Sequence, residues 1–344
     1  GSEMCIRDSD CAMAKDRFSR GHSEGAVPTD PVTGITSVPP PRPRRLGESV
    51  VAPGRVLGWA EFGHPDGDPV LWFHGTPGAR TQIPPSVDQV ALQRGFRIIA
   101  VERPGTGAST DHQYERILDF AADIEAVVED LGIGRFGAVG LSGGGPYVLA
   151  VAHEMPHRFM VGTLLGGIGP TRGPDAVWSY TRALRFVAPT LQLLRSRLGS
   201  ALGPIVGSLE TMGEQALGVF AAIIGGSDRE VLTEPEFGSM FINDLANAKE
   251  LRAVAHDMAL FARHWGFLLE DVTPPVICWQ GLADSIVPPS HGHHQAARLP
   301  NGQLRVRPGE GHFAGFSDAV AVLVAIRVVW ALESIEPISN ETDS

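Results

Sequence analysis

Cysteine, lysine and long apolar runs are all scarce in this sequence. Of the three cysteines only Cys278 lies in an apolar segment typical of a core, where a small buried thiol is its expected role, so no disulfide framework is predicted. The longest apolar run, 319–332, is too short to span a bilayer and contains Arg327. Nor does the chain start with a charged stretch followed by an apolar segment, as a secretion signal would. We therefore expect a cytoplasmic protein with no membrane partner.

Positive charge is also in deficit. The 344 residues carry 28 lysines and arginines against 39 aspartates and glutamates, a formal net charge of −11, and only Lys15 and Lys249 are lysines. Phosphate backbones repel a protein this acidic, so we expect no nucleic-acid partner. An apolar content of 43% instead suits a globular protein, and the length allows one large core or two smaller ones.

The first 45 residues lack the periodicity of a helix or a strand. GSEMCIRDSD resembles a cloning scar followed by translated adapter sequence, and Met13 is a candidate natural start. The polar residues and the VPPPRPRR segment that follow have no apolar pattern either. We therefore expect 1–45 to be a disordered, partly non-native leader and 336–344 to be a tail.

Apolar runs typical of buried strands alternate with segments of helical spacing from Arg55 onward. The strand-like segments are RVLGWAEFG, PVLWFHG, FRIIAVERPG, RFGAVG, FMVGTLLGG, PPVICWQG and GQLRVRPG. The helical segments are VDQVALQRG, ERILDFAADIEAVVEDLGI, PYVLAVAHEM, a helix near HHQAARL and 319–332. This alternation predicts an α/β fold with a mainly parallel sheet covered on both faces, built from 46–169 and 271–335.

Residues 170–270 interrupt this rhythm, because they contain no convincing strand. Three segments there are apolar at helical spacing: ALRFVAPTLQLLRSRL, QALGVFAAIIGG and AVAHDMALFARHWGFLL. Such helices either form a lid over one end of the sheet or extend the core. We expect 170–270 to be a helical cap.

The segment AVGLSGGGP concentrates glycines around Ser142, between a predicted strand and a predicted helix. G-x-S-x-G at such a junction is the nucleophile elbow, a strained turn on which the serine hydroxyl protrudes above the sheet. Side chains at the flanking positions would collide with the neighbouring strand or helix. Pro146 fits the first helical turn, where its missing N–H has no consequence. Ser142 is therefore the candidate nucleophile.

A serine hydroxyl needs a base and a carboxylate that orients the base. Asp284 follows the predicted strand VICWQG, and His312 follows the last predicted strand, in the chain order Ser, Asp, His expected of this architecture. Glu310 lies too close to His312 in the chain to orient its imidazole, and Asp175 is the alternative acid. We predict a triad of Ser142, His312 and Asp284.

The oxyanion hole requires two backbone N–H groups aimed at the developing alkoxide. Gly143, the residue after the nucleophile, is expected to supply one. The loop HGTPG (74–78) is expected to supply the other from Thr76, because Pro77 has no N–H. His74 is the first residue of this loop, and we expect it to hold the loop by hydrogen bonds.

Five motifs resemble the α/β-hydrolase superfamily, in the order that the family shows, over about residues 50–335. They are HGTPG (74–78), ERPGTGAS (102–109), GLSGGG (140–145), GLADSIVP (281–288) and GEGHF (310–314). The first two resemble a bacterial subgroup of lid-bearing hydrolases. The resemblance implies a three-layer αβα sandwich with an eight-stranded sheet, a helical cap and the Ser142–His312–Asp284 triad. It assigns Glu102 and Arg103 to a structural loop without a catalytic role.

The serine at the elbow argues against haloalkane dehalogenases and most epoxide hydrolases, which use aspartate there. We expect a serine hydrolase that cleaves small-molecule carboxylic esters through an acyl-enzyme on Ser142, without a metal or an organic cofactor. One alternative is a proline iminopeptidase-like aminopeptidase, although that family's loop reads HGGPG and its lid carboxylates bind an amino group. The candidates for that role are Glu210, Glu214, Glu230, Glu234 and Glu236. Two further alternatives are a slow-turnover ligand receptor and a perhydrolase.

Apolar residues of the predicted cap are candidates for the substrate pocket. They are Trp178, Leu184, Phe186, Leu191, Phe220 and Trp265. His291, His293 and His294 lie on the polar start of a predicted helix, where we expect solvated side chains and no metal site, because no cysteine or carboxylate cluster accompanies them. The sequence leaves the oligomeric state unknown.

Overall fold

The computed structural model describes residues 41–187, 189–190, 193, 217–219, 221–248 and 251–335. The expected leader therefore lies outside the described residues except for 41–45, and the expected tail lies outside them entirely. Among the described residues, no helix is both long enough and apolar enough to cross a bilayer.

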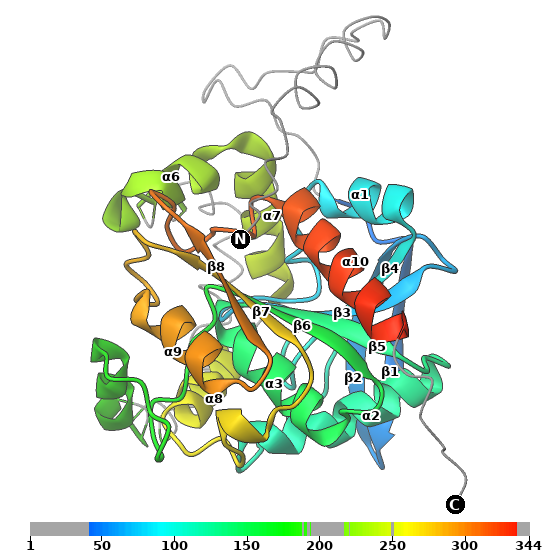
Figure 1. The fold of residues 1–344 in the computed structure, drawn as a ribbon, viewed down its shortest axis with the longest axis horizontal. Helices are drawn as coiled ribbons and strands as arrows, with labels where there is room; N and C mark the ends of the chain where they lie inside the picture. Colours follow the sequence, from blue (N-terminus) through cyan, green and yellow to red (C-terminus); the bar gives the residue numbers. More distant parts are fainter. Residues whose placement is uncertain are drawn as a thin grey trace, which may run out of the picture. The chain divides into compact units, whose positions relative to one another are not determined.

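Eight strands of the described chain form one sheet in the order β1-β2-β4-β3-β5-β6-β7-β8 (Figure 1). Strand β1 pairs antiparallel with β2, as β2 does with β4, and the other neighbours are parallel. This confirms the predicted eight-stranded, mainly parallel sheet. The strands are β1 (Arg45–Ala52), β2 (Arg55–Gly63), β3 (Asp68–Phe73), β4 (Phe96–Val101), β5 (Phe136–Leu141), β6 (Phe159–Leu165), β7 (Val276–Gly281) and β8 (Gly302–Arg307).

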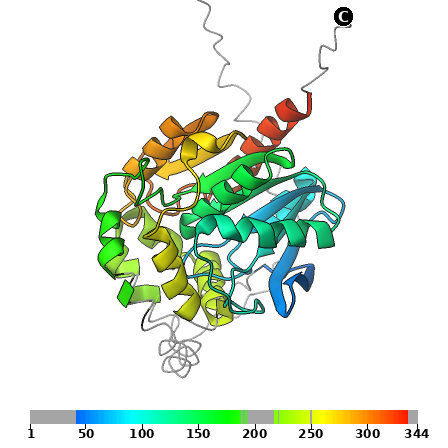
Figure 2. The same ribbon diagram turned by 90° about the horizontal axis from the view of Figure 1, so that it is seen from below.

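Helices cover both faces of this sheet, as the alternation of segments predicts. Helices α1 (Val87–Arg94) and α10 (Ala319–Ile335) pack on one face. Helices α2 (Phe120–Asp130), α3 (Gly145–Glu154) and α9 (Ser290–Arg298) pack on the other, which is turned toward the viewer in Figure 2. An apolar core fills each interface, so the strands are buried from both sides. Short 3₁₀ turns precede α2 and β7, at Ile117–Asp119 (η1) and Leu269–Asp271 (η4).

Between β6 and β7 the described residues form helices and no strand. They are η3 (Tyr180–Ala183), α6 (Gly226–Thr233), α7 (Pro235–Ala248) and α8 (Leu251–Phe261), which lie together at one side of the sheet in Figure 2. We call residues 166–275 the insertion. Of the first two helices expected there, residues 184–187, 189–190 and 193 and residues 217–219 and 221–224, respectively, are helical, and part of each lies outside the described residues.

The third expected helix is shorter than its apolar pattern. Helix α8 ends at Phe261, whereas the pattern continues to 269. Gly266 has a φ of 105°, which a helix cannot contain, and Trp265 turns into the main core instead. The apolar spacing of this segment therefore reflects two packing environments and not one helix.

Candidate active site

Ser142 lies on the abrupt turn between β5 and α3, in a short 3₁₀ segment, η2 (Ser142–Gly144). Its φ is 51°, and among the described residues it is the only non-glycine residue with a positive φ. Close contacts with neighbouring backbone atoms leave no room for a side chain at two of the glycines around it. A Cβ on Gly140 would lie 2.6 Å from the Gly144 carbonyl carbon, and one on Gly144 would lie 2.3 Å from the Phe73 oxygen. The strained turn is therefore fixed by close backbone approach, as the nucleophile-elbow motif predicts.

The imidazole of His312 lies against the carboxylate of Asp284. His312 Nδ1 donates to Asp284 Oδ2 at 2.9 Å, and both side chains are buried. The other carboxylate oxygen accepts from the amides of Ile286 (2.9 Å) and Val287 (2.8 Å). Gly166 lets the pair approach the end of β6, because a Cβ there would lie 3.1 Å from His312 Nδ1. The bond at Nδ1 fixes the tautomer and leaves Nε2 for a substrate or a nucleophile.

Ser142 and His312 line the same cavity, which brings all three predicted triad residues to one place. Among the described residues no hydrogen bond joins the Ser142 hydroxyl to His312. In unliganded sites this bond is often long and shortens when substrate binds. The alternative acids lie elsewhere: Asp175 accepts from the Leu269 amide at 3.0 Å, and Glu310 pairs with Arg307.

The two predicted oxyanion-hole residues lie against each other beside Ser142. A Cβ on Gly143 would lie 2.5 Å from Thr76 Oγ1 and 2.8 Å from Phe261 Cζ. In the described part of the chain neither amide donates to a group outside its own turn, and Gly143 is too near the start of η2 for an intrahelical partner. Both N–H groups are therefore available to a substrate oxygen.

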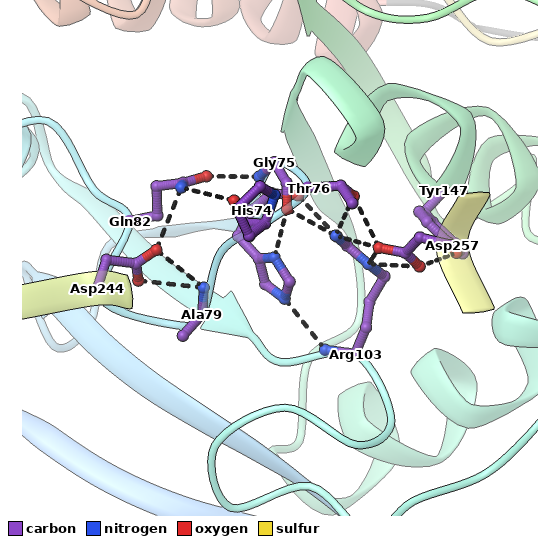
Figure 3. Close-up of polar contacts among 10 residues, drawn as sticks. His74, Gly75, Thr76, Ala79, Gln82, Arg103, Tyr147, Asp244 and Asp257 are labelled. Atoms are coloured by element: carbon purple, nitrogen blue, oxygen red, sulfur yellow. Dashed lines mark hydrogen bonds and ion pairs between the residues drawn. The ribbon is translucent and has the colours of Figure 1, made fainter. Parts of the chain in front are cut away.

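The loop that carries Thr76 is held by a polar network (Figure 3). His74 Nδ1 donates to the Gly75 carbonyl at 2.8 Å, and His74 Nε2 accepts from the Arg103 amide at 3.3 Å. This confirms that His74 holds the loop. Burial, and then the nearby Arg103 charge, keep the pKa of His74 well below its usual 6.5, so the ring is neutral. Arg103 in turn is paired with Asp257 of α8, at 2.8 Å.

Two cavities meet at Ser142. The histidine compartment, about 250 Å³, is lined by Leu232, Phe241, Leu245, His312 and Phe313 among others. The glycine compartment, about 360 Å³, is lined by Gly143, Ile168, Leu184, Met258 and Phe261 among others. Thr76, Ser142 and Ile286 line both. Apart from His312, none of the described residues that line either compartment has an acidic or basic side chain.

The predicted pocket residues divide into three groups. Leu184 lines the glycine compartment. Trp178, Phe186 and Trp265 do not line either compartment, so their prediction was wrong. Trp178 is 86% exposed and packs on Arg182, because Val177 beside it takes the buried position, whereas Trp265 belongs to the main core. Phe186 is 71% exposed. Leu191 and Phe220 lie outside the described residues.

A family model matches more than half of this chain. Residues 68–319 match the alpha/beta hydrolase fold. The chain belongs to the alpha/beta hydrolase fold family. This confirms the family resemblance of its five motifs.

Relatives of this alpha/beta hydrolase include proline iminopeptidases. The enzyme of Neisseria meningitidis serogroup B (strain ATCC BAA-335 / MC58) is 35% identical over 153 residues, which is 41% of this chain and 48% of the relative. The chain thus spans about half the length of that relative. A probable proline iminopeptidase of Leptolyngbya boryana is 25% identical over 291 residues, 78% of this chain and 89% of the relative. An esterase structure from Rhodococcus sp. ECU1013 superimposes with a TM-score of 0.60 at 22% identity, covering 83% and 98% of the two chains, which shows the fold alone.

The prediction of a solvated His291 was wrong. His291 is fully buried: its Nδ1 accepts from the Gly169 amide at 2.8 Å, and its Nε2 faces the hydroxyls of Ser179 (3.0 Å) and Thr181 (3.1 Å). Burial lowers the pKa of His291 to about 4. The side chain of His293 is exposed, as expected, and His294 is half-buried. The run HGHHQAAR gave no sign of which histidine the helix turns inward.

Sequence reasoning also missed two buried aspartates of the insertion. Asp228 on α6 accepts from the amides of His312 (2.8 Å) and Phe313 (3.0 Å). Asp244 on α7 accepts from the Ala79 amide at 3.0 Å and from the Thr81 hydroxyl at 2.8 Å. Burial raises the pKa of Asp244 to about 8, against hydrogen bonds that favour the ionised form. Both aspartates therefore hold loops of the site from the insertion.

Proposed function

We propose that this alpha/beta hydrolase is a serine hydrolase that cleaves carboxylic esters through an acyl-enzyme on Ser142. The observation that carries the proposal is the cavity shared by Ser142, on its strained turn, and His312, whose ring is hydrogen-bonded to Asp284 at 2.9 Å. A nucleophile, a base and an orienting carboxylate at one site are the requirements of acyl transfer.

In this proposal His312 accepts the proton of Ser142 as the serine oxygen attacks the ester carbonyl. The amides of Thr76 and Gly143 stabilise the tetrahedral oxyanion, and Asp284 stabilises the imidazolium. His312 then gives the proton to the leaving alcohol, and water repeats the cycle on the acyl-enzyme. These residues complete the cycle without a metal or an organic cofactor.

The two compartments favour an ester with apolar groups on both sides of the carbonyl. The leaving oxygen must lie near His312, which protonates it, so the alcohol belongs in the histidine compartment. The acyl chain then extends into the glycine compartment, which is the larger one at about 360 Å³. In this arrangement the insertion acts as a cap, because its side chains line both compartments.

The second candidate is an aminopeptidase that releases N-terminal proline, favoured by the sequence relatives. Such an enzyme must bind the substrate's amino group, and none of the described lining residues is a carboxylate. Glu230, Glu234 and Glu236 are exposed to solvent and line neither compartment, while Glu210 and Glu214 lie outside the described residues. The described cavity surface thus supports the esterase over the aminopeptidase.

Comparing p-nitrophenyl butyrate with proline p-nitroanilide tests the proposal. We expect multiple turnovers on the ester, slow or no release from the anilide, and complete loss of ester turnover in Ser142→Ala. Faster turnover of the anilide would favour the aminopeptidase. A wild-type protein that binds the ester without repeated turnover would instead favour the ligand receptor.

A further inference from the structure

The direction of the Thr76 amide is set by the carbonyl of Gly75, since both belong to one peptide group. That peptide is trans, because the only cis bond in the described chain joins Thr76 to Pro77. The Gly75 carbonyl accepts from Arg103 Nη2 at 2.7 Å and from His74 Nδ1 at 2.8 Å (Figure 3). In a planar trans peptide the carbonyl and the N–H point in opposite directions. Two donors that hold the carbonyl therefore also aim the Thr76 N–H away from Arg103.

Arg103 is suited to this task only if its guanidinium is fixed. It donates to two consecutive carbonyls, His74 at 2.6 Å and Gly75 at 2.7 Å, and to the Thr76 hydroxyl at 2.9 Å. Its side chain is buried, so its charge needs a partner close by. The carboxylate of Asp257 is that partner, with Oδ2 at 2.8 Å from Nη2 and 3.0 Å from Nε.

Asp257 also reaches the loop directly. The Thr76 hydroxyl donates to Asp257 Oδ2 at 2.7 Å, and the Tyr147 hydroxyl donates to Asp257 Oδ1 at 2.7 Å (Figure 3). Asp257 lies on α8 and is itself buried, so these bonds are shielded from water. Among the described residues, the hydrogen-bond partners of its carboxylate are thus the loop, the arginine that holds the loop and one tyrosine.

We propose that Asp257 is a positioning residue for the oxyanion hole: through Arg103 and the Thr76 hydroxyl it fixes the direction of the Thr76 N–H. The inference rests on the proposed function, since Asp257 acts on the same site through residues that contact the oxyanion loop. It gives the insertion a part in transition-state stabilisation, because a residue of α8 controls a donor that the core loop supplies.

The chain contains a matched control for a merely structural ion pair. Asp123 on α2 accepts both Arg55 nitrogens, at 2.9 and 2.7 Å, and a hydrogen bond from the Tyr114 hydroxyl. This aspartate has the same partner types as Asp257, an arginine and a tyrosine, and among the described residues it makes no hydrogen bond to a loop of the candidate site. Asp123→Asn therefore removes an equivalent buried charge without touching the oxyanion loop.

The experiment compares Asp257→Asn with Asp123→Asn in the full chain. Active sites are counted by fluorophosphonate labelling, and kcat, KM and the inhibition constant of an alkylboronic acid are measured with p-nitrophenyl butyrate. A boronic acid forms a tetrahedral adduct with the serine and so reports transition-state stabilisation. We expect Asp257→Asn to lower kcat about 10- to 100-fold, less than the loss of a whole donor, with KM little changed. The boronate inhibition constant should rise by a similar factor, and Asp123→Asn should keep the wild-type kcat.

Thr76→Val provides a second test, which does not depend on the folding of Asp257→Asn. Valine has nearly the same size as threonine, so the loop keeps its packing. The substitution removes the hydroxyl that donates to Asp257, so kcat should fall and the loss should not add to that of Asp257→Asn in the double variant. A wild-type kcat and boronate affinity per labelled site in Asp257→Asn, or in Thr76→Val, would overturn the inference and leave the proposed function intact. A wild-type protein that is neither labelled nor active would overturn the proposed function, and this inference with it.

Discussion

At Ser142 the chain accepts a backbone conformation that non-glycine residues rarely adopt. Its φ of 51° is held by contacts that leave no room for a side chain on Gly140 or Gly144. Strain of this kind costs about 1–3 kcal/mol and persists only where the surrounding structure enforces it. The same close packing extends to Gly143, whose amide is proposed to bind the oxyanion.

Gly143→Ala should separate catalysis from folding. The new Cβ would lie 2.5 Å from Thr76 Oγ1 and 2.8 Å from Phe261 Cζ, so the Thr76 loop must move away from the elbow. We expect kcat on p-nitrophenyl butyrate to fall on the order of 100-fold, the size of the loss of one oxyanion donor. Thermal unfolding measured on the same sample controls for folding. A kcat equal to that of the wild type would show that the two amides do not act together.

Buried His291 should make the free energy of unfolding of the protein depend on pH. Its pKa is lowered to about 4 in the folded protein, mainly by burial, from 6.5 in the unfolded chain. As the pH falls below 6.5 the unfolded state takes up the proton first, so stability is lost between pH 6.5 and 4 and is fully present above 6.5. The loss reaches on the order of 3 kcal/mol at the acid end.

Urea unfolding at several pH values measures this effect. His291→Gln keeps an acceptor for the Gly169 amide and a donor toward Thr181, but it has no titrating group in this range. The wild type should lose more free energy of unfolding than His291→Gln between pH 6.5 and 4. If both proteins lost the same free energy of unfolding between pH 6.5 and 4, the pKa of His291 would not be lowered in the folded protein.

Among the elements, the strands and helices of the core could be predicted from the sequence, whereas the edge strand β1 and helix α6 of the insertion could not. Buried parallel strands such as β5 and β7 are continuous apolar runs, which the sequence displays directly. Strand β1 was missed because it is an antiparallel edge strand in which Ser49 is the only buried residue. Helix α6 was missed because its sequence, GSDREVLT, is mostly polar and buries only Asp228 and Leu232.

Different elements of the insertion build the two compartments. Leu184, which follows η3, lines only the glycine compartment, and Leu245 of α7 lines only the histidine compartment. Leu184→Trp should therefore reduce kcat/KM for long acyl chains more than for short ones, while the dependence on alcohol length stays as in the wild type. Leu245→Trp should show the reverse pattern.

Two ester series, one varied in the acyl chain and one in the alcohol, measure both dependences, and each variant serves as the control for the other. Equal effects of both variants on both series would contradict the assignment of alcohol and acyl chain to separate compartments.

In the whole molecule, the order of the motifs along the chain predicted where the candidate triad residues meet. The long-range polar contacts of the insertion could not be predicted from the sequence. The candidate triad residues follow β5, β7 and β8, whose carboxyl ends meet at one edge of a parallel sheet, so topology alone predicts their meeting. Asp228, Asp244 and Asp257 contact their loops across 84 to 181 residues of sequence. In a chain with 39 acidic residues, no local pattern distinguishes these three buried carboxylates from solvated ones.

The proposed function depends most directly on Ser142 as the nucleophile. Reaction with a fluorophosphonate, followed by peptide mapping, measures this without assuming a natural substrate. We predict one adduct per chain, on the peptide that contains Ser142. It should form much more slowly in His312→Ala and should be absent in Ser142→Ala. An adduct on a different residue, or no adduct on folded wild-type protein, would contradict the proposed function.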